Sequence, residues 1–226
     1  MRLLTILATL AALGLLFVPA AEADLLLLDY FGYDYTTPAP RDFTADGQEY
    51  IAVGDVTDIN PAALATDPLN NQYTFVLRAG TLTSADTVWT PFGDVATYQF
   101  NDGDGTFHIY EDPIATGTDR DWGSYPPNVT APAYFEDGTL ILGATFTNLT
   151  IKVKLADWTA NLNGTLHFYC GEGWGSLPCY EGWTFAGETI EPGQPDGYMW
   201  TIDGLVYVEE ISTETTSWGD LKGLFR

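Results

Sequence analysis

The sequence predicts an all-β protein: one antiparallel β-sandwich or jelly-roll-like domain of about ten to twelve strands over residues 24–211. Two observations carry this prediction. Asp-Gly and Asn-Gly pairs recur between apolar segments, and such pairs suit type I′ hairpin turns, which need a positive φ at both central residues. The segments between the pairs alternate apolar with polar residues, as strands with one buried face do.

The chain begins with a secretory signal peptide, residues 1–23. Arg2 precedes an apolar run from Leu3 to Val18, and Ala21-Glu22-Ala23 has the small-x-small pattern that signal peptidase cleaves. The run is shorter than the roughly 20 residues of a membrane span, so cleavage is expected rather than an uncleaved anchor. The mature chain is expected to be exported, extracellular or at the cell surface, with no transmembrane segment.

The turn and strand signals follow one another along the chain. The turn pairs are Asp46-Gly47, Asp102-Gly103, Asp104-Gly105, Asp137-Gly138, Asn163-Gly164, Asp196-Gly197 and Asp203-Gly204. Alternation is clearest over 72–78, 140–146 and 149–155, where apolar residues occupy every second position. Prolines between 112 and 135 interrupt the pattern and predict a long loop there, because proline cannot donate to a β-ladder.

The net charge of −23 argues against polyanionic partners. So acidic a surface repels nucleic acid and anionic lipid, so neither is expected to bind. A plainer reading of the charge is that it keeps an exported protein in solution.

The only two cysteines, Cys170 and Cys179, are predicted to form a disulfide, as an isolated pair in an exported protein usually does. Closing so short a loop contributes about 2–3 kcal/mol in the chain-entropy model. The pair would fix a loop rather than hold the whole fold.

Acidic turns offer oxygen ligands of the kind that Ca²⁺ takes. The first candidate set is Asn101, Asp102 and Asp104 with Glu111 and Asp112, and the second is Asp119 with Asp121. The alternative reading is a hairpin turn that happens to be acidic. No cofactor other than calcium is indicated.

Aromatic residues near the predicted loops suggest a second kind of site. Trp122, Tyr125, Trp174 and Tyr180 could stack on sugar rings while nearby polar side chains bond the hydroxyls. The alternative is that these rings fill the core or its edge, as aromatic residues more often do.

No catalytic constellation stands out, and the protein is expected not to be an enzyme. Only His108 and His167 could serve as an imidazole base, and neither lies in a nucleophile motif. A carboxylate pair for glycoside hydrolysis remains a third hypothesis, because so acidic a chain contains many pairs by chance.

Several segments resemble uncharacterised exported bacterial proteins that often carry a PEP-CTERM sorting tail. They are residues 98–112, Asp137-Gly138-Thr139-Leu140-Ile141-Leu142-Gly143, Asn163-Gly164-Thr165-Leu166 and Gly182-Trp183-Thr184-Phe185-Ala186-Gly187, within about residues 95–205. The resemblance implies a β-rich surface or matrix protein. The tail differs, because residues 212–226 carry no Pro-Glu-Pro motif with an apolar span and arginine cluster. This segment is either a frayed terminal turn or a sorting segment of another kind.

The leading hypothesis is therefore an exported acidic surface or extracellular-matrix protein without catalytic activity, with calcium binding in its acidic turns. The alternative is a lectin-like carbohydrate-binding module. The expected partners are a glycan or a component of the cell surface or matrix. Self-assembly through exposed strand edges is a further hypothesis.

Overall fold

A computed structural model gives the fold and describes residues 25–37, 48–60, 64, 66–114, 131–169, 182–190, 194–195 and 197–208. The strands among them belong to one compact unit, Leu25–Val208. Residues 1–23, predicted as a signal peptide, the two cysteines and residues 212–226 lie outside the described residues, so the predictions about them stay predictions.

The described residues form ten strands and one short helix. They are β1 (Leu25–Thr37), β2 (Glu49–Ile59), β3 (Asn71–Arg78), β4 (Leu82–Thr90), β5 (Gly93–Phe100), β6 (Thr106–Pro113), α2 (Ala131–Phe135), β7 (Thr139–Lys154), β8 (Thr159–Phe168), β9 (Trp183–Ile190) and β10 (Trp200–Val208). The all-β class predicted from the sequence is therefore confirmed. No helix in this part of the chain is long and apolar enough to cross a membrane.

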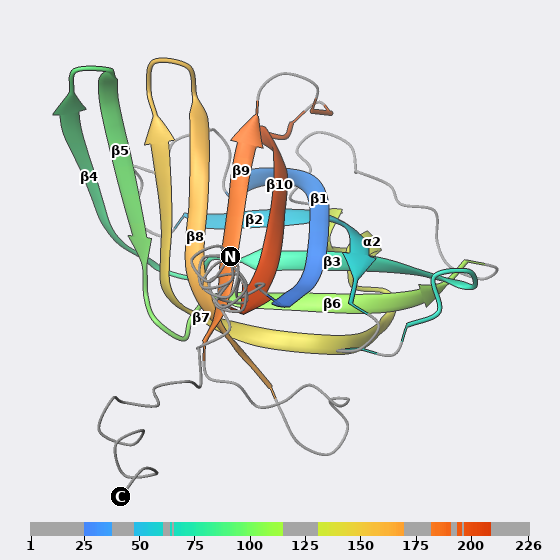
Figure 1. Ribbon diagram of the computed structural model, residues 1–226. Coiled ribbons are helices and arrows are strands. Elements are labelled where there is room, and N and C mark those ends of the chain that lie inside the picture. The colour runs from blue at the N-terminus through green and yellow to red at the C-terminus, as the bar shows by residue number, and fades with distance from the viewer. Residues whose placement is uncertain are drawn as a thin grey trace, which may run out of the picture. The chain divides into compact units, whose positions relative to one another are not determined.

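The sheet closes on itself instead of forming two packed layers. Its strand order is β4-β5-β7-β6-β3-β2-β1-β10-β9-β8, and an additional pairing joins β7 to β8. Eight strands, β7-β6-β3-β2-β1-β10-β9-β8, thus make a closed antiparallel barrel, while β4 and β5 stand outside the closure (Figure 1). The predicted sandwich or jelly roll is corrected to a barrel, because β8 pairs with both β7 and β9 and so leaves no gap between two sheets.

Aromatic rings fill the interior of the barrel. Tyr30, Phe75, Phe107, Phe146 and Phe185 are all fully buried. Tyr30 lies 5.1 Å from Phe75 and 5.2 Å from Phe185 between ring centroids, and Phe146 lies 5.1 Å from Phe185. An eight-stranded barrel is just wide enough for side chains to fill it. The centre is therefore a packed core.

Two glycines make room for Tyr30. A Cβ on Gly204 would lie 2.3 Å from the Tyr30 hydroxyl oxygen, and a Cβ on Gly187 would lie 2.6 Å from it. Both distances are far below van der Waals contact, and a Cβ on Gly204 would also lie 2.3 Å from the Ala186 carbonyl oxygen, so a side chain at these positions would displace the ring and, at Gly204, the backbone as well. The hydroxyl donates a 3.1 Å hydrogen bond to the Ala186 carbonyl oxygen between them.

A β-bulge explains a change of phase in the sequence pattern. The buried apolar side chains of β7 occupy even positions up to Phe146 and odd positions from Leu149 onward. The pairing of β7 with β8 shifts between Thr147 and Thr150, and Asn148 has a φ of 55°. One extra residue in the bulge keeps both halves of the strand facing the core.

Two of the predicted hairpin turns are wrong. Asn163-Gly164 lies within β8 and Asp203-Gly204 lies within β10. The prediction for 101–105 is confirmed, because this segment is the turn between β5 and β6. The glycines at 164 and 204 serve packing rather than turning, since a Cβ on either would meet a core side chain.

A second, smaller core lies on the outer wall of the barrel. The helix α2 contacts β2 and β3 there, and Phe135 is fully buried against Val53 and Val76. The Thr74 hydroxyl donates a 2.9 Å hydrogen bond to the Phe135 carbonyl oxygen. Residues 131–135, predicted as part of a long loop, are thus helical where they cover this face.

Candidate functional site

Because aromatic rings fill the barrel, the candidate site lies outside it, on β4 and β5. We call these two strands and their turn, Leu82–Phe100, the side hairpin. Along the same edge of β7, β6 pairs with residues 139–145 and β5 pairs with residues 150–154. The side hairpin therefore continues the barrel wall beyond the end of β6, and Figure 1 shows its tip beside the tip of the β7–β8 hairpin.

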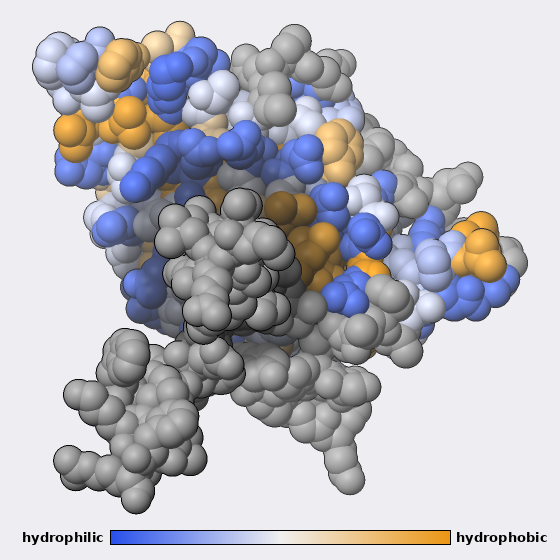
Figure 2. Space-filling view, in the orientation of Figure 1, coloured by the Kyte–Doolittle hydropathy of each residue, from blue (hydrophilic) through white to orange (hydrophobic). Residues whose placement is uncertain are grey.

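The two neighbouring tips are bonded to each other and carry exposed apolar side chains. The Leu155 amide donates a 2.9 Å hydrogen bond to the Asp94 carbonyl oxygen. We call the apolar side chains the tip patch: Val88, Trp89, Phe92 and Trp158, with exposed fractions of 54%, 75%, 83% and 48%. Apolar surface over β4 and β5 is orange in Figure 2. Val88 and Trp89 are successive residues of β4 and therefore face opposite sides of the hairpin, so the tip patch surrounds the end of the molecule on both faces. Exposed apolar side chains gathered at one end of a protein commonly mark an interaction surface.

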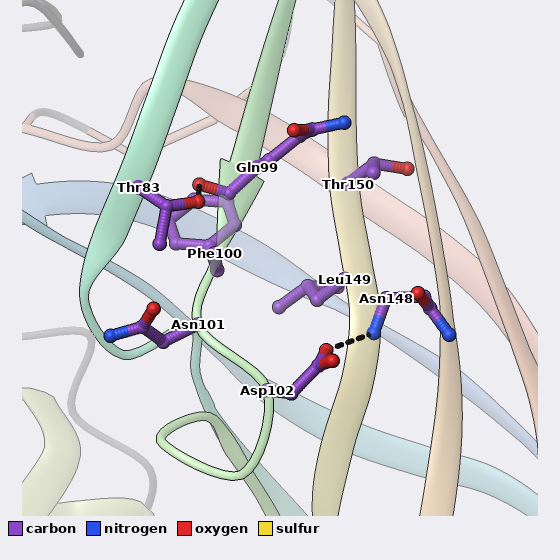
Figure 3. Close-up of a pocket in the computed structure, with 8 residues that line it drawn as sticks. All are labelled: Thr83, Gln99, Phe100, Asn101, Asp102, Asn148, Leu149 and Thr150. Carbon is purple, nitrogen blue, oxygen red and sulfur yellow. Dashed lines mark hydrogen bonds between the residues drawn. The ribbon is translucent and has the colours of Figure 1, made fainter.

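A polar pocket of about 300 Å³ lies at the foot of the side hairpin, where β5 separates from β7 (Figure 3). Phe100 and Leu149 are its buried apolar residues. The polar lining is Thr83, Gln99, Asn101, Asp102, Asn148 and Thr150. The volume is at the low end of the range for small-molecule sites, and the lining offers amide, hydroxyl and carboxylate groups together.

Hydrogen bonds hold the pocket in place. An oxygen of Asp102 accepts a 2.6 Å bond from the backbone amide of Asn148, so the acidic turn is fastened to the bulge of β7. Asn101 donates a 3.0 Å bond to Asp104, and Ser84 donates a 2.9 Å bond to the side-chain oxygen of Gln99. The Gln99 side chain extends from β5 toward β7 in Figure 3. The side-chain amides of Gln99 and Asn148 give the pocket its exposed donors.

The structure does not bring the first predicted calcium set together. Asn101, Asp102 and Asp104 precede β6, whereas Glu111 and Asp112 lie at its far end, roughly 23 Å along the strand. Glu111 accepts hydrogen bonds from the side chains of Asn71 and Tyr73, at 2.8 and 2.7 Å, and Asp112 accepts one from Gln72 at 3.0 Å. Within the described ranges no group of three His, Cys, Asp or Glu side chains could hold a metal ion.

The other predicted site residues fall outside the described residues. They are Asp119, Asp121, Trp122, Tyr125, Trp174 and Tyr180, together with Cys170 and Cys179. The second calcium set, the glycan site and the disulfide therefore stay predictions.

The two histidines lie on the outer wall. His108 packs against Tyr110 and Tyr169, and burial lowers its pKa. His167 is 2.8 Å from the Thr147 hydroxyl through Nε2. Both imidazole rings thus contact side chains of the outer wall, and neither histidine lines the pocket.

The largest pKa shifts belong to tyrosines inside the barrel. Burial raises the pKa of Tyr30 and of Tyr50 well above the usual value of 10. The nearby Asp34 carboxylate raises the pKa of Tyr50 further, and the Tyr50 hydroxyl donates a 2.6 Å hydrogen bond to it. The other Asp34 carboxylate oxygen accepts a 2.9 Å bond from the Trp200 amide, so the carboxylate joins β1, β2 and β10. These groups support the fold.

The sequence analysis missed the tip patch. A usable signal was present in Trp89-Thr90-Pro91-Phe92-Gly93, where a proline and a glycine mark a turn but a phenylalanine occupies it. An aromatic residue in a tight turn has no core to enter, so it is exposed.

Comparisons with protein families, with curated proteins and with solved structures each found no match. The fold and the surface therefore define the class by themselves: a closed antiparallel barrel with a solid core, and a side hairpin that carries an apolar tip and a polar pocket.

Proposed function

We propose that the protein is an exported, acidic protein of the cell surface or extracellular matrix that acts by binding rather than by catalysis. The observation that supports this most is the tip patch. It places Val88, Trp89, Phe92 and Trp158 on two bonded hairpin tips of a chain whose net charge is −23. Burying an exposed Trp or Phe side chain against a partner contributes on the order of 1.5–3 kcal/mol.

The pocket favours a second candidate, a carbohydrate-binding function, at a place different from the loops predicted from the sequence. Sugars present neighbouring hydroxyl groups that both donate and accept hydrogen bonds, together with an apolar ring face. Gln99, Asn148 and Asp102 supply matching donors and acceptors around the pocket. The pocket lining contains one carboxylate, Asp102, so it suits binding better than the two-carboxylate hydrolysis of glycosides.

The test is sedimentation with insoluble cell-wall and matrix polysaccharides. The exported protein is incubated with cellulose, chitin or peptidoglycan, and the fraction that sediments is measured. We expect the double substitution Trp89→Ala/Phe92→Ala to lower the bound fraction at least tenfold, because two exposed rings are removed. Gln99→Ala should also lower the bound fraction, because it removes a side-chain amide that donates hydrogen bonds into the pocket.

The matched control is Leu69→Ala/Ile114→Ala. Leu69 and Ile114 are also exposed, at 89% and 57%, but lie outside the tip patch and the pocket lining. Equal loss in both double variants would contradict a specific role for the tip patch. Full binding by Trp89→Ala/Phe92→Ala would contradict the proposed site, and no binding of the unmodified protein to any preparation would remove the carbohydrate candidate.

A further inference from the structure

The side hairpin ends in an open edge. Among the described strands, β4 stands at one end of the sheet order and pairs with β5 alone. All residues from Thr83 to Trp89 are exposed, so neither face of the strand is covered by described residues. The eight barrel strands, in contrast, each have at least two neighbours.

The edge lacks the features that usually block edge-to-edge pairing. Natural edge strands are protected by lysine, proline or a central bulge, because an open row of N–H and C=O groups recruits other strands. Between Leu82 and Thr90 the only charged residue is Asp86. The one irregularity lies between Leu82 and Ser84, which leaves Ser84 to Thr90 in regular register. Such a strand is suited to pairing with another.

The hydrogen bonds of β5 show which residues of β4 face outward. The Asp94 carbonyl oxygen accepts a hydrogen bond from the amide of Leu155, the residue directly after β7, so Asp94 directs its backbone groups away from β4. Trp89 is opposite Asp94, and in an antiparallel ladder such a residue directs its own N–H and C=O to the free side. By alternation, Ala85, Thr87 and Trp89 offer their backbone groups to an incoming strand.

Three of the possible antiparallel two-fold registers have their axis between Ala85 and Trp89: on Asp86, on Thr87 or on Val88. A two-fold axis on Asp86 would place two like charges directly opposite, which is destabilising. An axis on Thr87 would place the Asp86 carboxylate opposite the apolar Val88 side chain on both sides of the axis, so neither side chain would have a favourable cross-strand partner. An axis on Val88 places Val88 opposite its own copy and lets Thr87 and Trp89 exchange hydrogen bonds with Trp89 and Thr87 of the second copy.

The register centred on Val88 also builds an apolar row. Val88 is opposite Val95 of β5, so the row becomes Val95, Val88, and the same two residues of the second copy. The two Asp86 carboxylates are then four residues apart along the strands, about 14 Å. This exceeds the Debye length of about 8 Å at physiological ionic strength, so their repulsion is largely screened.

We propose that β4 is a self-association edge: it pairs antiparallel with β4 of a second copy of this chain, with Val88 on the two-fold axis. The two side hairpins then form one continuous sheet between two barrels. A two-fold contact of this kind uses the same surface on both copies and closes as a dimer. Because each chain carries a net charge of −23, association strengthens as salt screens the charge.

Cysteine cross-linking tests the register on the exported full protein. In a pair that does not exchange hydrogen bonds the Cα atoms are about 4.5 Å apart, within the range that a disulfide spans. With diamide as oxidant, Val88→Cys is expected to give a covalent dimer on a non-reducing gel. Asp86→Cys, at about 14 Å, and Leu69→Cys, away from the edge, are expected to remain monomers. Equal cross-linking of Val88→Cys and Leu69→Cys would indicate random collision and overturn the proposal, and cross-linking of Asp86→Cys but not Val88→Cys would overturn the register.

Light scattering after size exclusion tests association without a covalent bond. The unmodified protein is expected to double its mass as NaCl rises from 10 mM to 1 M, where the Debye length falls from about 30 to 3 Å. Val88→Lys should stay monomeric and Leu69→Lys should not. A monomer at every salt concentration, or a particle larger than a dimer, would refute the two-fold pairing. If Leu69→Lys also fails to associate, the loss is not specific to β4 and the proposed contact is wrong. If Val88→Lys still forms a dimer, the contact does not include Val88 and the proposal is wrong as well.

Discussion

Alkaline pH should unfold this barrel through two buried phenols, those of Tyr30 and Tyr50. Tyr30 is 0% exposed and Tyr50 is 1% exposed, and burial raises the pKa of each well above 10. In the unfolded chain both phenols ionise near pH 10, whereas in the barrel they stay protonated. The stability that they contribute is therefore fully present below pH 10 and is lost as the pH rises toward their folded pKa values.

The expected slope follows from proton counting. Each phenol that ionises only in the unfolded chain lowers the free energy of unfolding by about 1.4 kcal/mol per pH unit. Two phenols lower it by about 2.7 kcal/mol per unit, against a total of roughly 5–15 kcal/mol for a domain. One unit above pH 10 thus removes a substantial part of the stability.

The assay is urea unfolding followed by circular dichroism between pH 9 and 12. Tyr50→Phe should reduce the slope of stability against pH by about 1.4 kcal/mol per unit, and Tyr30→Phe should do the same. Phe146→Leu is the control, because it loosens the same core without removing a phenol, and its slope should match the unmodified protein. An unchanged slope in Tyr50→Phe would refute the assignment of a buried, protonated phenol.

Two further predictions concern packing and calcium. Gly204→Ala should destabilise the protein by about 3 kcal/mol or more in urea unfolding, because its Cβ would lie 2.3 Å from both the Ala186 carbonyl oxygen and the Tyr30 hydroxyl oxygen. Gly103→Ala is the comparison: nothing lies within 4 Å of a Cβ there, but its φ of 82° strains a side chain by about 1–2 kcal/mol. A loss in Gly204→Ala no larger than that in Gly103→Ala would contradict steric overlap as the cause. Calcium binding now depends on the second predicted set, Asp119 and Asp121, because the first set is spread over the two ends of β6. If this set binds calcium, the thermal midpoint should be higher in millimolar Ca²⁺ than in EDTA, by the equivalent of about 2.7 kcal/mol at a hundredfold excess over Kd, and an unchanged midpoint would remove the prediction.

Local patterns predicted individual strands well. The alternation of Tyr73, Phe75 and Leu77 correctly gave the inner face of β3, and the exposed Lys152 and Lys154 fit the outer face of β7. The other face of β3 is buried as well, because Thr74 and Val76 lie under α2 in the second core, and the alternation did not predict this. These patterns succeed because the burial of alternate residues is a local consequence of the strand period.

Closure of the barrel could not be predicted in this way. It depends on β1 pairing with β10, which lies more than 160 residues away, and on β8 pairing with two strands at once. Gly204 shows the same difficulty at one residue. Asp203-Gly204 has the composition of a turn, but the glycine is needed where the Tyr30 ring crosses the barrel interior, a contact that no local window contains.

The candidate site was missed for a related reason. Asp102 was predicted as a calcium ligand from its acidic neighbours, whereas the structure engages it with the Asn148 amide, 46 positions further along the chain. The bulge at Asn148 is visible in the sequence only as a change of phase between Phe146 and Leu149. Its bond to the 101–105 turn, which forms one wall of the pocket, is a tertiary contact.

The pairing of β3 with β6 makes the side hairpin a detour between two neighbouring strands. Arg78, the last residue of β3, is directly opposite Thr106, the first residue of β6. A short turn could join these two ends without altering the strand order of the closed ring. Residues 79–105 nevertheless contribute Ala79, Ala96 and Phe100 to the main core, so the detour folds together with the barrel and its surface can vary only where these three side chains are spared.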